Sequence, residues 1–179
     1  LVLFFASGMA CLPLWVNWSK RTEKHRAVMW ICFFSGVSFL LYLPLRAVPN
    51  YWTMSFAAIL SGVGFSAAFT LLRSMLADLV EVELAGTGND RSGLYYAFLS
   101  GAFKTGASMA IGIPYILLGV IVGFDPNAEN SPGTVNGLMY VFVGVPFLFY
   151  CLAGLIIRDY PITRSVHNEA LKRAKAVKG

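Results

Sequence analysis

Charge is scarce in this chain of 179 residues. Asp, Glu, Lys and Arg together make up 13% of the sequence, whereas hydrophobic residues make up 57% and aromatic residues 15%. Soluble globular domains carry roughly a quarter of charged residues. The composition therefore excludes a soluble globular domain and indicates an integral membrane protein.

Side chains suited to catalysis or metal binding are also few. His25 and His167 lie in basic segments far from any second ligand, and the G-T-G at residues 86–88 has no strand before it of the kind a dinucleotide site needs. No Ser/His/Asp or Cys/His arrangement is readable, which disfavours an enzyme, and neither a metal site nor a cofactor is expected. Three cysteines lie in separate apolar runs without ligand spacing, at Cys11, Cys32 and Cys151.

Long apolar runs are abundant instead. A helix needs about 20 apolar residues to cross a hydrocarbon core of roughly 30 Å, and continuous runs favour helices over a barrel. The sequence predicts an all-α membrane protein with transmembrane residues 1–157 and a basic tail at residues 158–179. Because the first run starts without an initiator Met, we expect a fragment of a longer protein. Five spans are expected, at about residues 1–16, 27–46, 52–76, 94–124 and 134–157.

The basic residues predict how these spans are oriented. Four Lys/Arg lie in residues 19–26, one is Arg91 and six lie in the tail, whereas Arg46 alone lies on the other side, in a short turn at residues 46–50. By the positive-inside rule, the tail is cytoplasmic in a multi-pass protein of the plasma (inner) membrane. The excess positive charge is thus a topology signal, and no nucleic-acid partner is expected.

Residues 77–104 form a polar stretch between the third and fourth runs, and Lys104 lies about ten residues into the fourth. An unpaired ammonium inside a membrane is costly, so we expect Lys104 to face a cavity and attract a substrate oxygen or a carboxylate. Alternatively, the helix starts near Thr105 and leaves Lys104 at the interface. Arg73, at the end of the third run, either anchors that span by snorkelling or binds an anionic substrate.

Asp78 and Glu81 are three residues apart and therefore share one helical face. They form either a solvated helix end or a gate latch, which pairs with basic side chains in one conformation and releases them in the other. The expected basic partners are Lys20, Arg21 and Arg91. Residues 85–93 are expected to be a flexible connection.

Several of these motifs resemble the glycoside-pentoside-hexuronide cation symporter family of the major facilitator superfamily. They are A-D-L-V-E at residues 77–81, R-S-G-L-Y-Y at residues 91–96, and a lysine about a dozen residues later, Lys104. The basic segment 19–26 and G-F-D-P-N at residues 123–127 extend the resemblance to nearly the whole chain, as spans eight to twelve of that fold. The chain has Ser92 where the family usually has glutamate, and Arg73 where an uncharged residue is usual.

The resemblance implies cation-coupled symport of a sugar or sugar acid by alternating access, with sodium or a proton as the coupling ion. It places Lys104 on the substrate and cation pathway, where we also expect Arg73 and Tyr96, and the added charge of Arg73 favours an anionic substrate. The expected partners are the small-molecule substrate, membrane lipid and the amino-terminal half of the same transporter. The alternatives are a lipid or amphiphile carrier of the same fold and a non-transporting membrane scaffold or sensor.

Overall fold

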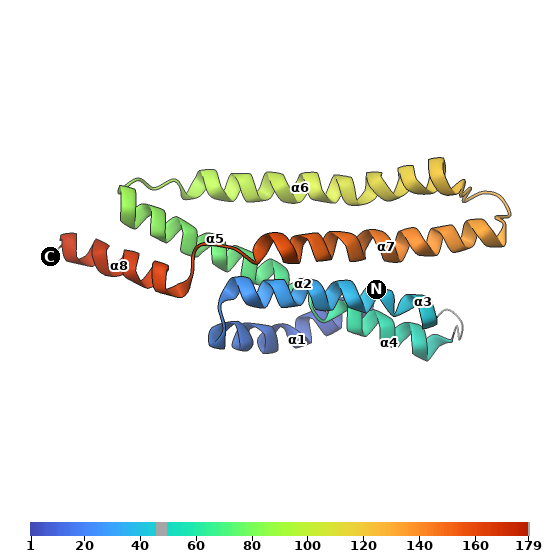
Figure 1. The fold of residues 1–179 in the computed structure, drawn as a ribbon, viewed down its shortest axis with the longest axis horizontal. Coiled ribbons are helices and arrows are strands. Elements are labelled where there is room, and N and C mark those ends of the chain that lie inside the picture. Colours follow the sequence, from blue (N-terminus) through green and yellow to red (C-terminus); the bar gives the residue numbers. More distant parts are fainter. Residues whose placement is uncertain (46–49, 179) are drawn as a thin grey trace.

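The structure is a computed structural model that describes residues 1–45 and 50–178, and it describes residues 173–178 by their backbone alone. All the secondary structure in that part of the chain is helical (Figure 1). Five of its helical stretches are long and apolar enough to cross a membrane. The predicted all-α class is confirmed.

The helices overlap the predicted spans, and most of their bounds differ from the predicted ones by a few residues. In chain order they are α1 (Val2–Arg21), α2 (Lys24–Leu40), α3 (Tyr42–Leu45), α4 (Tyr51–Gly62), α5 (Phe65–Thr87), α6 (Ser92–Ile116), the π-helix η1 (Leu117–Val122), α7 (Pro132–Ile157) and α8 (Arg164–Lys178). The basic segment at residues 19–26 is therefore largely helical, and the predicted tail contains a helix. Arg46 and Pro49 of the predicted turn lie outside the described residues.

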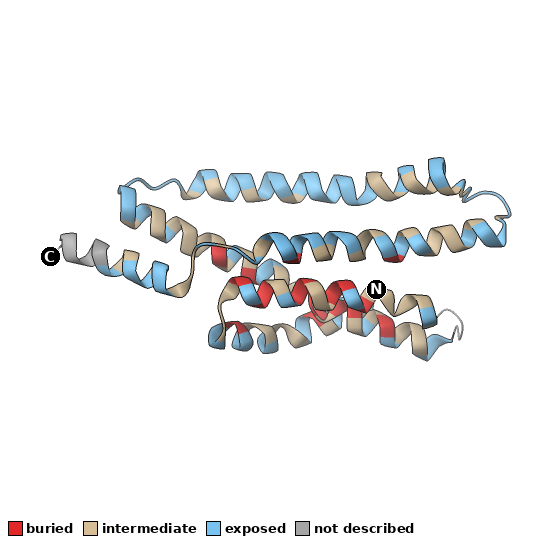
Figure 2. Ribbon diagram, in the orientation of Figure 1, coloured by how far each residue is buried: buried red, intermediate tan, exposed pale blue. Residues whose placement is uncertain are grey.

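Helix α2 forms the centre of the packed bundle, where it contacts α1, α4, α5 and α7. Figure 2 shows the buried residues concentrated on α2 and on the adjoining parts of its neighbours. Ile31 of α2 is fully buried, and its cluster includes Leu71 and Met75 of α5. By contrast, α6 has no buried residue and lies along one side of the bundle.

Two of the long helices begin with side-chain caps, which supply acceptors for backbone N–H groups that the helix itself cannot bond. The Asn50 side-chain oxygen accepts from the backbone N–H of Thr53 at 2.9 Å, at the start of α4. The Ser131 hydroxyl accepts from the backbone N–H of Thr134 at 3.2 Å, and Pro132 follows it at the start of α7. These caps fix the ends of α4 and α7.

The third predicted span is interrupted, because Val63 and Gly64 separate α4 from α5. Side chains of α1 bond to carbonyl groups at this break. The Trp15 indole N–H donates to the Val63 carbonyl oxygen at 3.0 Å, and the Ser7 hydroxyl donates to the Ile59 carbonyl oxygen at 2.8 Å. A broken helix inside lipid needs such partners, so α1 stabilises the interruption.

Small residues let α1, α2 and the α4–α5 break approach at backbone distance. A methyl group on Gly62 would overlap the Phe4 carbonyl oxygen, and one on Gly64 would overlap the Ser35 hydroxyl. A methyl group on Gly8 would lie 2.8 Å from the Gly62 carbonyl oxygen. Close contact of this kind is how helices associate in lipid, where burial of apolar surface gives little driving force.

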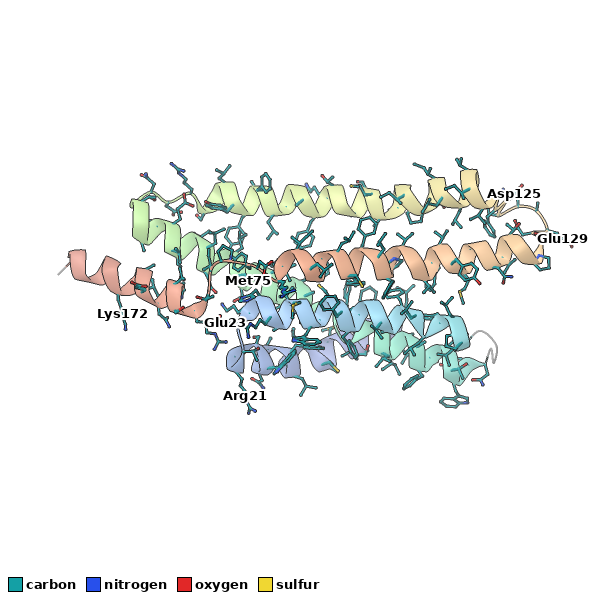
Figure 3. All side chains as sticks on the ribbon, viewed as in Figure 1. Arg21, Glu23, Met75, Asp125, Glu129 and Lys172 are labelled. Carbon is teal, nitrogen blue, oxygen red and sulfur yellow. The ribbon has the colours of Figure 1, made fainter. Side chains whose placement is uncertain are left out.

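One end of the bundle gathers the basic residues, and we call it the basic end. It comprises residues 19–26, 78–91 and 158–172. Figure 1 shows that α5 and α8 extend past α1, α2 and α7 there. In Figure 3, Arg21, Glu23, Met75 and Lys172 lie toward this end, and Asp125 and Glu129 lie at the opposite end.

Substitution of Gly62 by alanine should destabilise the bundle, because the added methyl group overlaps the backbone of α1. We expect Gly62→Ala to lower the free energy of unfolding by about 1–3 kcal/mol, the usual effect of overpacking. Thermal unfolding of the purified full-length protein measures this. The matched control is Gly86→Ala in α5, where nothing lies within 4 Å. Equal stability of the two variants would show that the close approach at Gly62 is unimportant.

Candidate functional site

The best-connected polar group at the basic end is an ion pair between α2 and α5. The Lys24 ammonium lies 2.7 Å and 2.9 Å from the two carboxylate oxygens of Asp78, and it also donates to the Ser74 hydroxyl at 2.8 Å. The side chains of Lys24 and Asp78 are 26% and 23% exposed. Charge-assisted hydrogen bonds in such a partly buried place are stronger than an exposed ion pair.

The segment after α7 folds back onto this pair. The Tyr160 hydroxyl donates to the Met75 carbonyl oxygen at 3.5 Å, and burial together with the negative charge of Asp78 raises the Tyr160 pKa. The Arg164 guanidinium donates to the carbonyl oxygens of Ser19 and Lys20 in the last turn of α1. These contacts join the α7–α8 segment to both α1 and α5.

Two further pairs involve acids of α5. Glu81 lies 2.7 Å from the Nε2 atom of His167 in α8. Glu83 lies 3.5 Å from the Arg91 guanidinium, so this pair bridges the connection between α5 and α6. That connection is short: Gly88 ends α5 with φ 72°, a left-handed conformation that glycine adopts without strain.

Ser92, the residue at the position where the resembling family usually has glutamate, begins α6. Its backbone N–H donates to the Asp90 carboxylate at 2.9 Å. Hydrogen bonds from Ser92 lower the pKa of Asp90. The acid at the start of α6 is therefore supplied by Asp90, two residues earlier in the sequence.

The contacts of Asp78 and Glu81 differ from those predicted. Asp78 bonds to Lys24, and Glu81 bonds to His167. Among the residues that the structure describes, the side chains of Lys20 and Arg21 form no ion pair. His167 was expected to lie far from any second ligand, but α8 runs alongside α5 and brings its imidazole to the Glu81 carboxylate.

The three residues expected on the pathway lie on α5 and α6. Arg73, Tyr96 and Lys104 are all exposed. Neither Arg73 nor Lys104 has an ion pair or side-chain hydrogen bond among the described residues. The rings of Phe69 and Phe103 stack with centroids 5.0 Å apart, which places the helices close together near both cations.

A groove of about 580 Å³ lies between α6 and α7. Its walls are almost entirely apolar and include Gly106, Ile113 and Pro114 of α6 and Phe142 and Pro146 of α7. Lys104 is about 200° around the helix from Gly106, at 100° per residue, and therefore does not line this groove. The Lys104 side chain is exposed on α6, and the cavity that we expect it to face stays a prediction.

Sequence analysis missed Lys24, Ser74, Glu83, Arg164 and His167 as members of the polar network. A signal for one of them was present, because Ser74 and Asp78 are four residues apart and share a helical face. Glu83 meets Arg91 across the short α5–α6 connection, whereas Lys24, Arg164 and His167 meet partners far away in the sequence. Their meeting depends on how α8 packs against α5 and how α1 turns into α2.

Comparison with known proteins gives the family. The family profile described as MFS/sugar transport protein matches residues 1–164. The chain belongs to this family. The match confirms the resemblance to symporters of the major facilitator superfamily, and with five apolar spans the MFS/sugar transport chain is a multi-pass membrane protein.

Three relatives are similar to this MFS/sugar transport chain over most of its length. An uncharacterized symporter of Synechocystis sp. is 32% identical over 129 residues, which is 66% of this chain and 23% of that protein. The glucuronide carrier protein homolog of Escherichia coli K12 is 30% identical over 166 residues, 91% of this chain and 35% of that protein. The sodium-dependent lysophosphatidylcholine symporter 1-B of Danio rerio is 25% identical over 167 residues, 90% of this chain and 31% of that protein.

The chain thus spans about a quarter to a third of the length of these relatives. No solved structure gives a significant match.

The Lys24–Asp78 pair should show strong coupling in a double-mutant cycle. We expect Lys24→Met and Asp78→Asn each to destabilise the full-length protein, because each leaves a partly buried charge without its partner. The double variant should lose less stability than the two single variants lose together, with a coupling free energy of about 1–3 kcal/mol in thermal unfolding.

The exposed pair Arg158–Asp159, 3.9 Å apart, is the matched control, and its coupling should be near zero. Additive effects at Lys24 and Asp78 would show that their contact does not stabilise the bundle.

Proposed function

We propose that this chain is the carboxyl-terminal portion of a cation-coupled symporter that carries a sugar or sugar acid by alternating access. The observation that supports this most is the placement of Arg73 and Lys104 within membrane-spanning helices, without an acid partner among the described residues. Cations inside a membrane face a cavity or a partner, and they mark ion and substrate pathways. A carboxylate substrate would match them, and the Escherichia coli relative is named for glucuronide, a sugar acid.

The coupling ion is sodium or a proton. The Danio rerio relative is named as sodium-dependent. By the resemblance, the carboxylates that bind the cation belong to the amino-terminal half of the transporter, and Lys104 lies near them. That half is the expected partner of the exposed faces of α5 and α6, where Arg73, Tyr96 and Lys104 would line the pathway.

The orientation follows from the basic residues. Eleven Lys/Arg occur in residues 19–26, at Arg91 and in the tail, against Arg46 alone in the turn predicted on the other side. The positive-inside rule therefore makes the basic end cytoplasmic in the plasma (inner) membrane. The Lys24–Asp78 and Glu81–His167 contacts then lie at the cytoplasmic mouth of the transporter.

Transport requires that the cytoplasmic mouth open and close. A ligand shifts such an equilibrium only by its different affinity for the two states, so cation and substrate together must stabilise the occluded state. Contacts that hold the mouth in one state must be weakened in the other. Asp78, which pairs with Lys24 and whose negative charge acts on Tyr160, is the residue we assign to this gate.

Uptake into proteoliposomes by the full-length protein tests the function. The panel contains neutral sugars, sugar acids and a lysophospholipid, each with a sodium gradient, a proton gradient or neither. We expect gradient-dependent uptake of a sugar acid. Uptake of the lysophospholipid alone would establish the amphiphile carrier suggested by the Danio rerio relative, and no uptake of any solute would favour a scaffold or sensor.

Removal of the Lys104 ammonium should lower coupled uptake. We expect Lys104→Ala to reduce it about 10- to 100-fold, the equivalent of a lost charge-assisted hydrogen bond of about 1.5–3 kcal/mol, with unchanged expression. Lys172→Ala, at an exposed position in α8, is the matched control and should transport at the native rate. Native uptake by Lys104→Ala would remove Lys104 from the pathway.

Neutralising Asp78 should change the transport rate more than the substrate affinity, because the residue joins α5 to α2 at the mouth and is not one of the residues expected to contact substrate. We expect Asp78→Asn to change the maximal uptake rate about three- to tenfold, while the substrate dissociation constant changes less than about twofold. Substrate binding and initial uptake rates measure the two effects. An unchanged rate would argue against a gate at Asp78.

A further inference from the structure

Helix α8 is attached to the bundle through two side chains of different chemistry. Arg164 and His167 are three residues apart and so lie on one face of α8. Arg164 contacts the end of α1, and His167 contacts α5. A guanidinium stays protonated at all physiological pH values, whereas an imidazole gains and loses its proton within that range.

The Arg164 contact is a constant anchor. Its guanidinium donates to the Ser19 and Lys20 carbonyl oxygens, which belong to the last turn of α1 and have no acceptor role inside that helix. Its backbone N–H donates to the Glu23 carboxylate at 3.1 Å, so Glu23 also places a negative charge at the start of α8. Neither contact involves an imidazole.

The His167 contact is the variable one. Its Nε2 atom lies 2.7 Å from the Glu81 carboxylate, and the two side chains are 19% and 54% exposed. When the imidazole is protonated, this contact is an ion pair as well as a hydrogen bond. When the proton is lost, the charge attraction is lost with it, and at most a neutral–charged hydrogen bond remains.

The other acids of α5 and of the α1–α2 turn are already engaged. Asp78 pairs with Lys24, Glu83 with Arg91, and Glu23 accepts from Arg164. These acids therefore do not replace Glu81 as the partner of His167. The titratable and charged groups on the elements around His167 are Arg73, Asp78, Glu81 and Glu83 of α5, Lys20, Arg21, Glu23, Lys24, His25 and Arg26 at the α1–α2 turn, Arg158, Asp159 and Tyr160 before α8, and Arg164, Glu169 and Lys172 of α8 itself.

We propose that the His167–Glu81 contact is a pH-sensitive latch, which closes α8 onto α5 at low pH and lets α8 swing away about its Arg164 anchor as the pH rises. The direction follows from the charges: the protonated imidazole and the ionised carboxylate attract each other, and the neutral imidazole does not. Exposed and half-exposed ion pairs contribute little each, so the attachment equilibrium should change by about two- to fivefold. The proposal concerns the position of α8 and does not depend on the transported substrate.

Distance measurement between spin labels tests the latch in the full-length protein without substrate. The labels are placed at Asn17→Cys on α1 and Lys172→Cys on α8, both exposed positions, with the native cysteines replaced. At pH 6 we expect one predominant short distance. At pH 8.5 the fraction of longer distances should be about two- to fivefold larger.

Three variants identify the responsible group. In His167→Gln and in Glu81→Gln, the fraction of longer distances should be high at both pH values. In His167→Lys, which keeps a positive charge facing Glu81, that fraction should be low at both pH values. The matched control is His25→Gln at the other histidine of the chain, which should keep the native pH response.

The latch is refuted if the distances of the native labelled protein are the same at pH 6 and pH 8.5. It is equally refuted if His167→Gln responds to pH as the native protein does.

Discussion

The backbone contact among α1, α2 and the interrupted α4–α5 segment is the constraint on which the rest of the structure depends. Lipid gives helices no strong reason to associate, so their packing relies on how closely the backbones can approach. Gly8, Gly62 and Gly64 permit that approach, and Trp15 supplies a donor at the break. The direction in which α5 leaves this crossing decides where its polar second half lies.

That polar half of α5 gathers the ion pairs of the basic end. Asp78, Glu81 and Glu83 lie within two helical turns, and each is joined to a different part of the chain: α2, α8 and the start of α6. The three contacts differ in kind. A lysine pair with a second hydroxyl partner is the best hydrogen-bonded, a histidine pair depends on protonation, and an arginine pair at 3.5 Å is the longest.

Much of the fold could be predicted from the apolar runs, because spans in lipid need long apolar segments and basic residues remain on one side. The interruption at Val63 and Gly64 could not be predicted from the sequence, since both residues are compatible with a continuous span and the break depends on Trp15 from another helix. The polar contacts were harder to predict than the spans. Lys24 meets Asp78, while Lys20 and Arg21 do not, because the short turn after α1 sets the rotation of α2 about its axis.

Helix α6 is attached at its two ends and little in between. The Glu83–Arg91 pair holds its beginning, and at its far end the Asn130 side chain bonds to the backbone of Asp125 in the connection that leads to α7. Between these points, none of its residues is buried within the chain. A helix attached mainly at its two ends bends when a sideways force acts on it. The change from α- to π-helix three residues after Pro114, where the hydrogen-bond ladder is weakest, is where the bend would concentrate.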